Sequence, residues 1–205
     1  PVADLRRGET AQVVPSDVAV PGQHQKMNLM AAGLALLNLG IPAPVISGCA
    51  ARFTGIEHRL EPFYEAGGVR FYNDTAATIP EAAAAAIRAL GSPVIVTGGT
   101  DKNLDFTPLA DALADAKAVV LLGGMGSAKL ASLLKARHIP FSGPFSSLDE
   151  AVRTAVEAAA DGDSVVLSPG CASFEMFRDE FDRGHRWKNT VTATLPGGSR
   201  PVNAK

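Results

Sequence analysis

The sequence predicts an α/β fold: an open, mostly parallel, Rossmann-like sheet with helices on both faces. Three observations lead to this prediction. Hydrophobic residues make up 46% of the 205 residues, which is enough for a buried core. From residue 69 onward, short apolar strands alternate with helical stretches, as in parallel βαβ units. Segments rich in glycine or small polar residues follow the strand ends, where such sheets bind ligands.

Residues 1–46 are expected to form part of a separate domain. Residues 1–21 contain short β-like pieces interrupted by glycine and proline. The helical spacing of leucine and alanine predicts a helix over 22–39, which Gly40 ends. A second short helix is expected over 44–52.

The second domain is expected over residues 47–195 and begins with a β-hairpin. Residues 60–65 and 69–72 read as its strands, because they alternate in character and flank a glycine turn. The alanine-rich stretch after Thr78 predicts a helix ending near Leu90. Thr78 is the expected N-cap, with Pro80 in the first turn and Glu81 completing a capping box.

The remaining elements alternate regularly. Strands are predicted at 93–97, 118–122, 140–142 and 164–167, and helices at 108–116, 127–137, 148–159, 174–182 and 184–192. The spacing of Phe174, Phe177 and Phe181 is typical of a core stripe on the helix over 174–182. The tail over 196–205 contains glycine, serine and proline and is expected to be disordered.

Composition argues against several classes of function. The net charge is −2 and no basic stripe is present, which excludes a typical nucleic-acid surface. No apolar run is long enough to span a membrane. Cys49 and Cys171 lie far apart, which favours a reduced, cytoplasmic protein. The four histidines show no pair at metal-ligand spacing, so no metal site is predicted. The chain opens on Pro1, and we expect it to be a fragment.

Three polar segments are expected to converge at one edge of the sheet, because each follows a parallel strand: residues 73–78, 98–102 and 168–173. They contain Lys102 and two hydroxyl residues at predicted helix starts, Thr78 and Ser173. A lysine beside free helix N–H groups suits a carboxylate or a phosphate. Each residue alone is also compatible with a solvated lysine or an ordinary helix cap. The residues alone do not name a reaction.

Four stretches in order together resemble the Mur ligases. They are GQHQKMN at 22–28, FTGIEHRLE at 53–61 with FYNDTAAT at 71–78, GGTDKNLDF at 98–106, and SPGCASFEMF at 168–177 with FDRG at 181–184. The resemblance covers about residues 18–190. It implies the end of a central ATP-binding domain over 1–46, followed by the C-terminal Rossmann-like domain that binds the amino acid.

The resemblance also implies a reaction. The full-length relative would be an ATP-dependent ligase that adds glutamate to UDP-N-acetylmuramoyl-L-alanine through an acyl phosphate in peptidoglycan synthesis. ATP and Mg²⁺ would be held mainly by segments that this chain lacks, so no catalytic residue is assigned and the chain alone is expected to be inactive. The implied ATP contacts are Arg59, Asp74 and Asn28, and the implied glutamate contacts are Thr78, Lys102, Ser173 and Phe174.

Three departures from the family pattern leave the stereochemistry of the amino acid open. Ala76 stands where other members have lysine, Gln25 follows His24 where they have asparagine, and Glu180 stands where some have an aromatic residue. A ligase for D-glutamate is the family default, and one for L-glutamate is the first alternative. A folate-polyglutamylating ligase and a non-catalytic Rossmann-like binding module are the others. The sequence does not indicate the oligomeric state.

Overall fold

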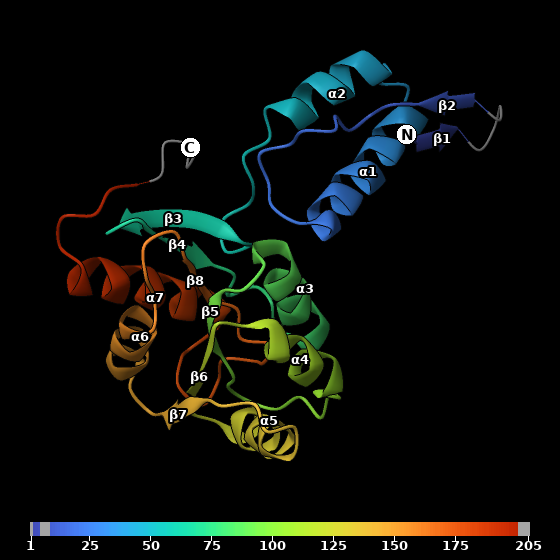
Figure 1. The fold of residues 1–205 in the computed structure, drawn as a ribbon. Helices are drawn as coiled ribbons and strands as arrows, with labels where there is room; N and C mark the ends of the chain where they lie inside the picture. The colour runs from blue at the N-terminus through green and yellow to red at the C-terminus, as the bar shows by residue number, and fades with distance from the viewer. Residues whose placement is uncertain (1, 5–8, 201–205) are drawn as a thin grey trace. The chain divides into compact units, whose positions relative to one another are not determined.

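The computed structural model describes residues 2–4 and 9–200, and the chain divides into two compact units (Figure 1). One unit ends at Gly55 and the other begins at Ile56. The sequence placed the boundary between residues 46 and 47. That point lies inside helix α2 (Ala43–Ala51), whose main-chain hydrogen bonds join the residues on both sides.

The first unit is small. It contains the antiparallel strands β1 (Val2–Asp4) and β2 (Glu9–Ala11), the long helix α1 (Gln23–Asn38) and helix α2. Its core is formed by Val13 and Ile46, which are almost fully buried. Gly33 on α1 lets these elements approach, because a Cβ atom there would lie 2.8 Å from a methyl group of Val13.

The second unit is built on a six-stranded sheet in the order β3-β4-β8-β5-β6-β7. Strand β3 runs antiparallel to β4, and all other neighbours are parallel. The strands are β3 (Glu61–Ala66), β4 (Val69–Asn73), β5 (Val94–Thr97), β6 (Ala118–Leu122), β7 (Ser142–Phe145) and β8 (Ser164–Leu167).

Helices cover both faces of this sheet (Figure 1). One face carries α3 (Pro80–Leu90), α4 (Thr107–Ala112), the short 3-10 helix Leu113–Asp115 and α5 (Met125–Ala136); the other carries α6 (Leu148–Glu157) and α7 (Glu180–Thr194). On β5, Ile95 packs into one core, whereas Val94 and Val96 pack into the other. The predicted fold class is therefore confirmed.

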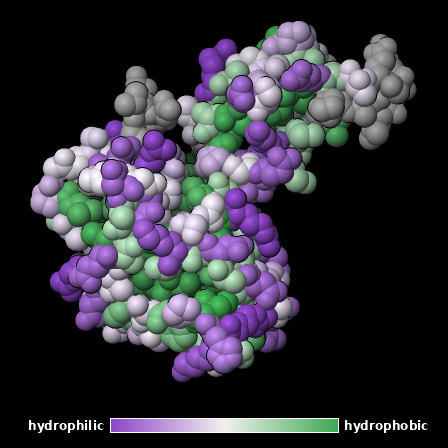
Figure 2. Space-filling model, viewed as in Figure 1, coloured by the Kyte–Doolittle hydropathy of each residue, from purple (hydrophilic) through white to green (hydrophobic). Residues whose placement is uncertain are grey.

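The surface of this unit is mixed in character. Figure 2 shows hydrophobic residues in the middle of its visible face and hydrophilic residues around its periphery. In the part of the chain that the structure describes, no helix is both long and apolar enough to cross a membrane.

The C-terminal helical region differs from the prediction. Two helices were expected over 174–182 and 184–192, but a turn closed by Phe177 N–H and Ser173 C=O (2.9 Å) comes first, and α7 then runs unbroken. Asp179 sets the start of α7, because its carboxylate accepts the N–H of Asp182 at 2.7 Å. The expected core stripe was therefore wrong for Phe174 and Phe181, which are mostly exposed.

The predicted capping box on α3 is also absent. Ile79 is the N-cap, with no side-chain hydrogen bond to the helix, and Pro80 is the first helical residue. Thr78 belongs to the preceding turn, where its N–H bonds to the C=O of Ala76 at 3.0 Å. The proline thus fixes the start one residue later than the capping pattern predicted.

The tail predicted over 196–205 is ordered in part. Ser199 and Glu65 exchange two backbone hydrogen bonds, of 2.8 and 2.9 Å, so residue 199 pairs with the edge strand β3. Residues 201–205 lie outside the described residues.

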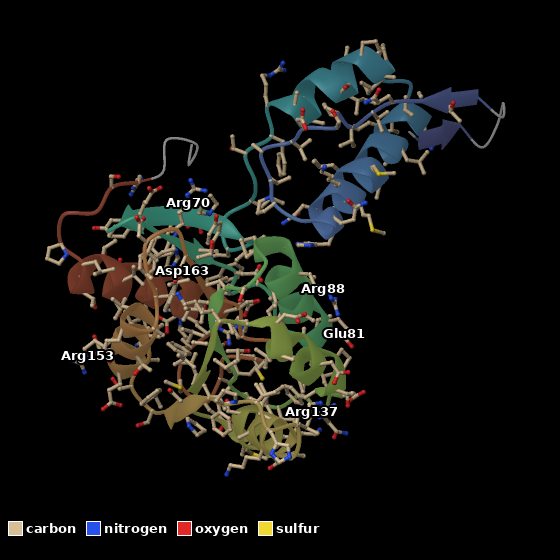
Figure 3. The ribbon with its side chains drawn as sticks, in the orientation of Figure 1. Arg70, Glu81, Arg88, Arg137, Arg153 and Asp163 are labelled. Carbon is tan, nitrogen blue, oxygen red and sulfur yellow. The ribbon has the colours of Figure 1, made fainter. Side chains whose placement is uncertain are left out.

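We expect Trp187→Ala to lower the free energy of unfolding by about 3–5 kcal/mol, because it leaves a large cavity under β4. Trp187 is fully buried, and its indole N–H donates to the C=O of Tyr72 at 3.0 Å. Chemical denaturation would measure the loss. The control is Arg153→Ala on α6, whose exposed side chain points away from the helix (Figure 3); it should stay within about 0.5 kcal/mol of the parent chain. Equal effects of the two substitutions would contradict the packing described here.

Candidate functional site

The three polar loops meet at the carboxyl edge of the sheet, as the sequence predicted. They follow β4, β5 and β8, which are neighbours in the order β4-β8-β5. Backbone hydrogen bonds join them: Gly170 N–H to Ala77 C=O and Gly98 N–H to Pro169 C=O, both 2.8 Å. Thr100 and Ala172 form an isolated antiparallel bridge with bonds of 3.0 and 3.1 Å. The loops therefore form one hydrogen-bonded layer.

A fourth loop, at the start of α5, joins this layer through glycines. Gly126 N–H bonds to Gly99 C=O at 2.8 Å, and Gly99 N–H bonds to the hydroxyl of Ser127 at 2.8 Å. Gly99 has a φ of 139°, and a Cβ atom there would lie 2.5 Å from the carbonyl oxygen of Ala172. Gly124 is equally restricted, since its Cβ would lie 2.4 Å from the carbonyl oxygen of Gly99. Only glycine fits this close backbone approach.

A buried arginine braces two of the loops from α7. Arg183 is fully buried, and its Nε and Nη2 donate to the hydroxyl and carbonyl oxygens of Thr75, both at 2.9 Å. Its Nη1 donates to the C=O of Cys171 at 3.2 Å. The hydroxyl of Thr75 in turn donates to the C=O of Glu180 at 2.8 Å. One guanidinium thus fixes the loop after β4, the loop after β8 and the start of α7 relative to each other.

Asp74 is a buried carboxyl group at the centre of this layer. Its oxygens accept the N–H of Leu60 at 3.0 Å and the hydroxyl of Ser168 at 2.6 Å. Burial raises the pKa of Asp74 to about 6, although these two hydrogen bonds and the charge of Arg59 act in the opposite direction. Asp74 and Arg59, predicted as ATP contacts, therefore lie close enough to interact electrostatically.

Arg59 itself is exposed and stands between two residues in the left-handed region, His58 (φ 68°) and Leu60 (φ 45°). Such backbone is costly for residues other than glycine and is kept only when the surroundings enforce it. Here the ring of His58 is hydrogen-bonded to Asn73, and the N–H of Leu60 to Asp74.

The third predicted ATP contact, Asn28, is exposed on α1 in the first unit, where its amide donates to Gln25 at 3.5 Å.

The loop that carries Lys102 is held by neighbouring charges. The carboxylate of Asp101 accepts the N–H groups of Asn103 and Leu104 at 2.8 and 3.3 Å. Lys129 on α5 donates to the C=O of Leu104 at 2.8 Å and to Asp101 at 3.4 Å. Lys102 is exposed, so its ammonium group is presented to solvent by a loop of fixed shape.

The other predicted glutamate contacts lie in the same layer with different exposures. Ser173 is 4% exposed and Thr78 is partly buried, whereas Phe174 is 67% exposed. A narrow crevice beside Ser173 has no room for a water molecule; it is also lined by Gly98, Gly99, Leu122, Gly123, Ala172, Met176, Phe177 and Arg183. The structure brings the loops of Thr78, Lys102 and Ser173 together; Asn28 belongs to the other unit.

Two histidines that are far apart in sequence meet next to Arg59. The ligand atoms of Glu57, His58 and His185 lie within 4.8 Å of one another, a grouping that the sequence did not predict. The amide nitrogen of Asn73 bonds both to Glu61, which only accepts, and to Nδ1 of His58 at 2.8 Å. Nδ1 therefore accepts and the ring proton sits on Nε2, the atom that a metal would need.

The carboxylate of this cluster is also occupied. Lys188 donates to Glu57 at 2.7 Å and to Glu61 at 3.0 Å. An ammonium group and a protonated Nε2 disfavour a cation at this position, so we interpret the cluster as a hydrogen-bonded charge network.

The thiol of Cys171 is not a candidate nucleophile, because burial raises its pKa to about 12.

Sequence reasoning missed the role of Arg183, although it lies in the FDRG stretch. The available signal was helical spacing: Arg183, Trp187 and Val191 recur every four residues on α7, and all three are fully buried. An arginine in line with two apolar residues on a helix face points into the core, where it needs acceptors.

The raised pKa of Asp74 makes a prediction about pH. The folded state binds one more proton than the unfolded state between the ordinary pKa of 3.8 and about 6. The free energy of unfolding should therefore fall as the pH rises from about 4 to about 6, and this contribution should be constant above that range. Urea unfolding at several pH values would show the slope, which Asp74→Asn should reduce. Asp115→Asn, at an exposed site, should retain the slope; a loss in both variants would contradict the assignment to Asp74.

Comparison with known proteins identifies the family of this chain. Residues 58–171, more than half of the chain, match the family described as Mur ligase, glutamate ligase domain. The chain is 51% identical over 140 residues to the UDP-N-acetylmuramoylalanine--D-glutamate ligase of Treponema pallidum, covering 68% of this chain and 26% of that protein. It is 43% identical over 192 residues to the enzyme of the same name from Roseiflexus, covering 92% and 41%. The chain thus spans about a quarter to two fifths of the length of these relatives.

Solved structures show the same fold. The UDP-N-acetylmuramate-alanine ligase MurC of Thermotoga maritima superposes with a TM-score of 0.63 at 18% identity, covering 86% of this chain and 40% of that one. The MurF ligase of Thermotoga maritima, solved in complex with ADP, gives 0.61 at 18% identity, covering 85% and 39%. On the family match over residues 58–171, the chain belongs to the Mur ligase family, and its second unit carries that family's glutamate ligase domain.

Proposed function

We propose that this chain is the glutamate-handling portion of an ATP-dependent ligase that joins D-glutamate to UDP-N-acetylmuramoyl-L-alanine in peptidoglycan synthesis. The observation that carries the proposal is the hydrogen-bonded layer of three loops, which brings together at one sheet edge the loops of Lys102, Thr78 and Ser173, the residues that would bind glutamate. The names of the relatives from Treponema pallidum and Roseiflexus support the substrate and the D stereochemistry.

In this proposal the substrate glutamate binds at the layer through its carboxylates. Lys102 supplies a mobile positive charge, and the hydroxyls of Thr78 and Ser173 donate hydrogen bonds, with the backbone of Phe174 assisting. The exposed Lys102 and the buried Ser173 suit two ends of one dicarboxylate. Holding both carboxylates orients the amine and lowers the entropy cost of its attack.

Arg59 and Asp74 would contact ATP from the same sheet edge. The first unit would be the end of the ATP-binding domain, with Asn28 as its contribution. In the reaction, the alanyl carboxylate takes the terminal phosphoryl group of ATP, the glutamate amine attacks the resulting acyl phosphate, and the C–N bond forms as the C–O bond to phosphate breaks. ADP, inorganic phosphate and a proton are the other products.

The triphosphate and its Mg²⁺ belong to other segments of the whole protein in this proposal. The sequence contains no G-x-x-x-x-G-K-[ST] loop. Among the described residues, the Glu57, His58 and His185 group does not fit Mg²⁺, which prefers oxygen ligands and would meet the ammonium of Lys188. No step is therefore routed through a metal on this chain. A cytoplasmic location follows from the nucleotide substrates.

The test is a phosphate-release assay of the whole enzyme with ATP, UDP-N-acetylmuramoyl-L-alanine and each enantiomer of glutamate. Preference for D-glutamate supports the proposal. Preference for L-glutamate would favour the alternative ligase, to which Ala76 and Glu180 gave weight. Turnover only with a folate acceptor would replace the proposal by the folate-polyglutamylating activity, and no turnover with any of them would favour a binding module.

We expect Lys102→Ala in the whole enzyme to raise the KM for glutamate about 10- to 150-fold, the range for losing one hydrogen bond to a charged group. The KM for ATP should change by less than about threefold, because the substitution removes no nucleotide contact. The matched control is Lys135→Ala, an exposed lysine in the last turn of α5. An unchanged KM for glutamate in Lys102→Ala would remove this residue from the site.

A further inference from the structure

The backbone on both sides of Arg59 is held in an unfavourable form. His58 and Leu60 both have positive φ, in the region where residues other than glycine are strained. Their side chains are buried, whereas Arg59 between them is exposed. The N–H of Leu60 donates to Asp74 at 3.0 Å, so one of the two neighbours is held by the site itself. The direction in which the Arg59 side chain leaves the backbone therefore also depends on what holds His58.

Hydrogen bonds hold both the main chain and the ring of His58. Its N–H donates to the carboxylate of Glu61 at 3.1 Å, and its C=O accepts the N–H of Ala76 at 3.1 Å. Its ring accepts the side-chain amide of Asn73 at 2.8 Å. A residue with positive φ keeps that backbone conformation only while such contacts enforce it.

Glu61 joins these contacts at one oxygen atom. Its Oε2 accepts the N–H of His58 and also, at 3.1 Å, the side-chain amide of Asn73. Asn73 is fully buried, and its amide oxygen accepts the N–H of Thr75 at 3.3 Å, so both ends of its side chain are engaged. The carboxylate of Glu61 therefore holds the main chain of His58 directly and its ring through Asn73.

Lys188 on α7 holds the other oxygen of this carboxylate. Its ammonium group donates to Oε1 of Glu61 at 3.0 Å and to Glu57 at 2.7 Å. The side chains of Lys188 and Glu61 are only 20% and 22% exposed, so water screens this ion pair less than one at the surface. Burial acts to lower the pKa of Lys188, but its hydrogen bonds to the two carboxylates raise the pKa overall, so the lysine stays charged.

We infer that Glu61 is a positioning residue for Arg59. Its carboxylate, held by Lys188, keeps His58 in the left-handed form. The backbone of the next residue is thereby fixed, and with it the direction of the Arg59 side chain at the sheet edge. Glu61 touches no substrate in this inference. The identity of the ligand that Arg59 meets, ATP, rests on the proposed function, whereas the effect of Glu61 on the backbone requires no ligand.

The first test measures the KM values of variants of the whole enzyme. Glu61→Ala should raise the KM for ATP about fivefold or more and leave the KM for glutamate within about twofold, because Glu61 acts through the nucleotide contact. Glu61→Gln should stay within about threefold of the parent enzyme, since its amide oxygen can still accept the N–H of His58. A similar rise in both KM values would indicate a merely structural role and would overturn the inference.

A double variant shows whether Glu61 acts through Arg59. Arg59→Ala should raise the KM for ATP, and adding Glu61→Ala to it should raise this KM by less than about twofold more, because the side chain to be positioned is gone. Effects of the two substitutions that simply multiply would mean that Glu61 acts independently, which would contradict the inference.

Glu65→Ala is the matched control. Glu65 lies on the same strand, β3, and its carboxylate pairs with the exposed Arg70 at 3.5 Å. Its removal changes the net charge equally and should leave the KM for ATP within about twofold of the parent enzyme. An equal rise in Glu61→Ala and Glu65→Ala would mean that only the charge on β3 matters and would also overturn the inference.

Hydrogen exchange in this chain tests the effect on the backbone without any ligand. The N–H groups of His58, Leu60 and Ala76 should exchange about tenfold faster in Glu61→Ala and at the parent rate in Glu65→Ala. Unchanged rates in both variants would refute the inference alone. Faster exchange in Glu61→Ala, together with an unchanged KM for ATP in Arg59→Ala, would refute the ATP contact of the proposed function and not the role of Glu61 in holding the backbone.

Lys188→Met provides a second variant in case Glu61→Ala does not fold. It releases the carboxylate of Glu61 from α7 while keeping most of the lysine side-chain volume. The same amides should exchange faster and the KM for ATP should rise, each by less than in Glu61→Ala, whereas Lys188→Arg, which keeps the charge, should stay within about twofold of the parent. No change in either measurement with Lys188→Met would overturn the inference.

Discussion

The backbone hydrogen bonds between the loops after β4, β8 and β5 are the interaction on which the candidate site depends. Strands that are distant in the chain become neighbours in the order β4-β8-β5, and their carboxyl ends then present three loops at one place. The bonds from Gly170 to Ala77 and from Gly98 to Pro169 turn these loops into a single layer. This layer positions residues such as Ser173 and Lys102, so main-chain atoms set the geometry of the site more than the side chains do.

The layer contains two buried ionisable groups that are treated in opposite ways. Asp74 accepts two hydrogen bonds, but burial still raises its pKa to about 6. A small fall in pH from neutrality therefore begins to protonate it. Arg183 contacts the next residue, Thr75, and keeps its charge despite full burial. The loop after β4 thus contains Asp74, whose pKa lies near the physiological range, and contacts Arg183, which stays charged at neutral pH. Of these two groups, only Asp74 therefore changes the electrostatic potential at this sheet edge as the pH changes near neutrality.

The sequence predicted the fold class and the convergence of the three loops, because alternating strands and helices leave few topologies for a parallel sheet. It did not predict the details that depend on tertiary contacts. Thr78 matched a capping pattern, but Pro80 placed the helix start one residue later, with Ile79 as the N-cap. Phe174 and Phe181 matched a helical stripe, but α7 begins beyond Phe174, and the buried residues of α7 are Arg183, Gly184, Trp187 and Val191. Both rings are therefore mostly exposed. Helical spacing could indicate that Arg183 is buried, but it could not identify the acceptors Thr75 and Cys171, which come from loops after two other strands.

The pairing of Ser199 with Glu65 has a consequence for solution behaviour. Strand β3 is the antiparallel margin of the sheet, and an uncovered margin presents free N–H and C=O groups to any other extended chain. The segment at Ser199 pairs with β3 and covers part of these main-chain groups. This pairing requires glycine at position 198, because a Cβ atom there would lie 2.4 Å from the ring of Tyr64. A chain shortened before Gly198 would expose the main chain of Glu65 and become prone to intermolecular β-pairing. Soluble yield in recombinant expression would thus depend on a few residues remote from the chemistry.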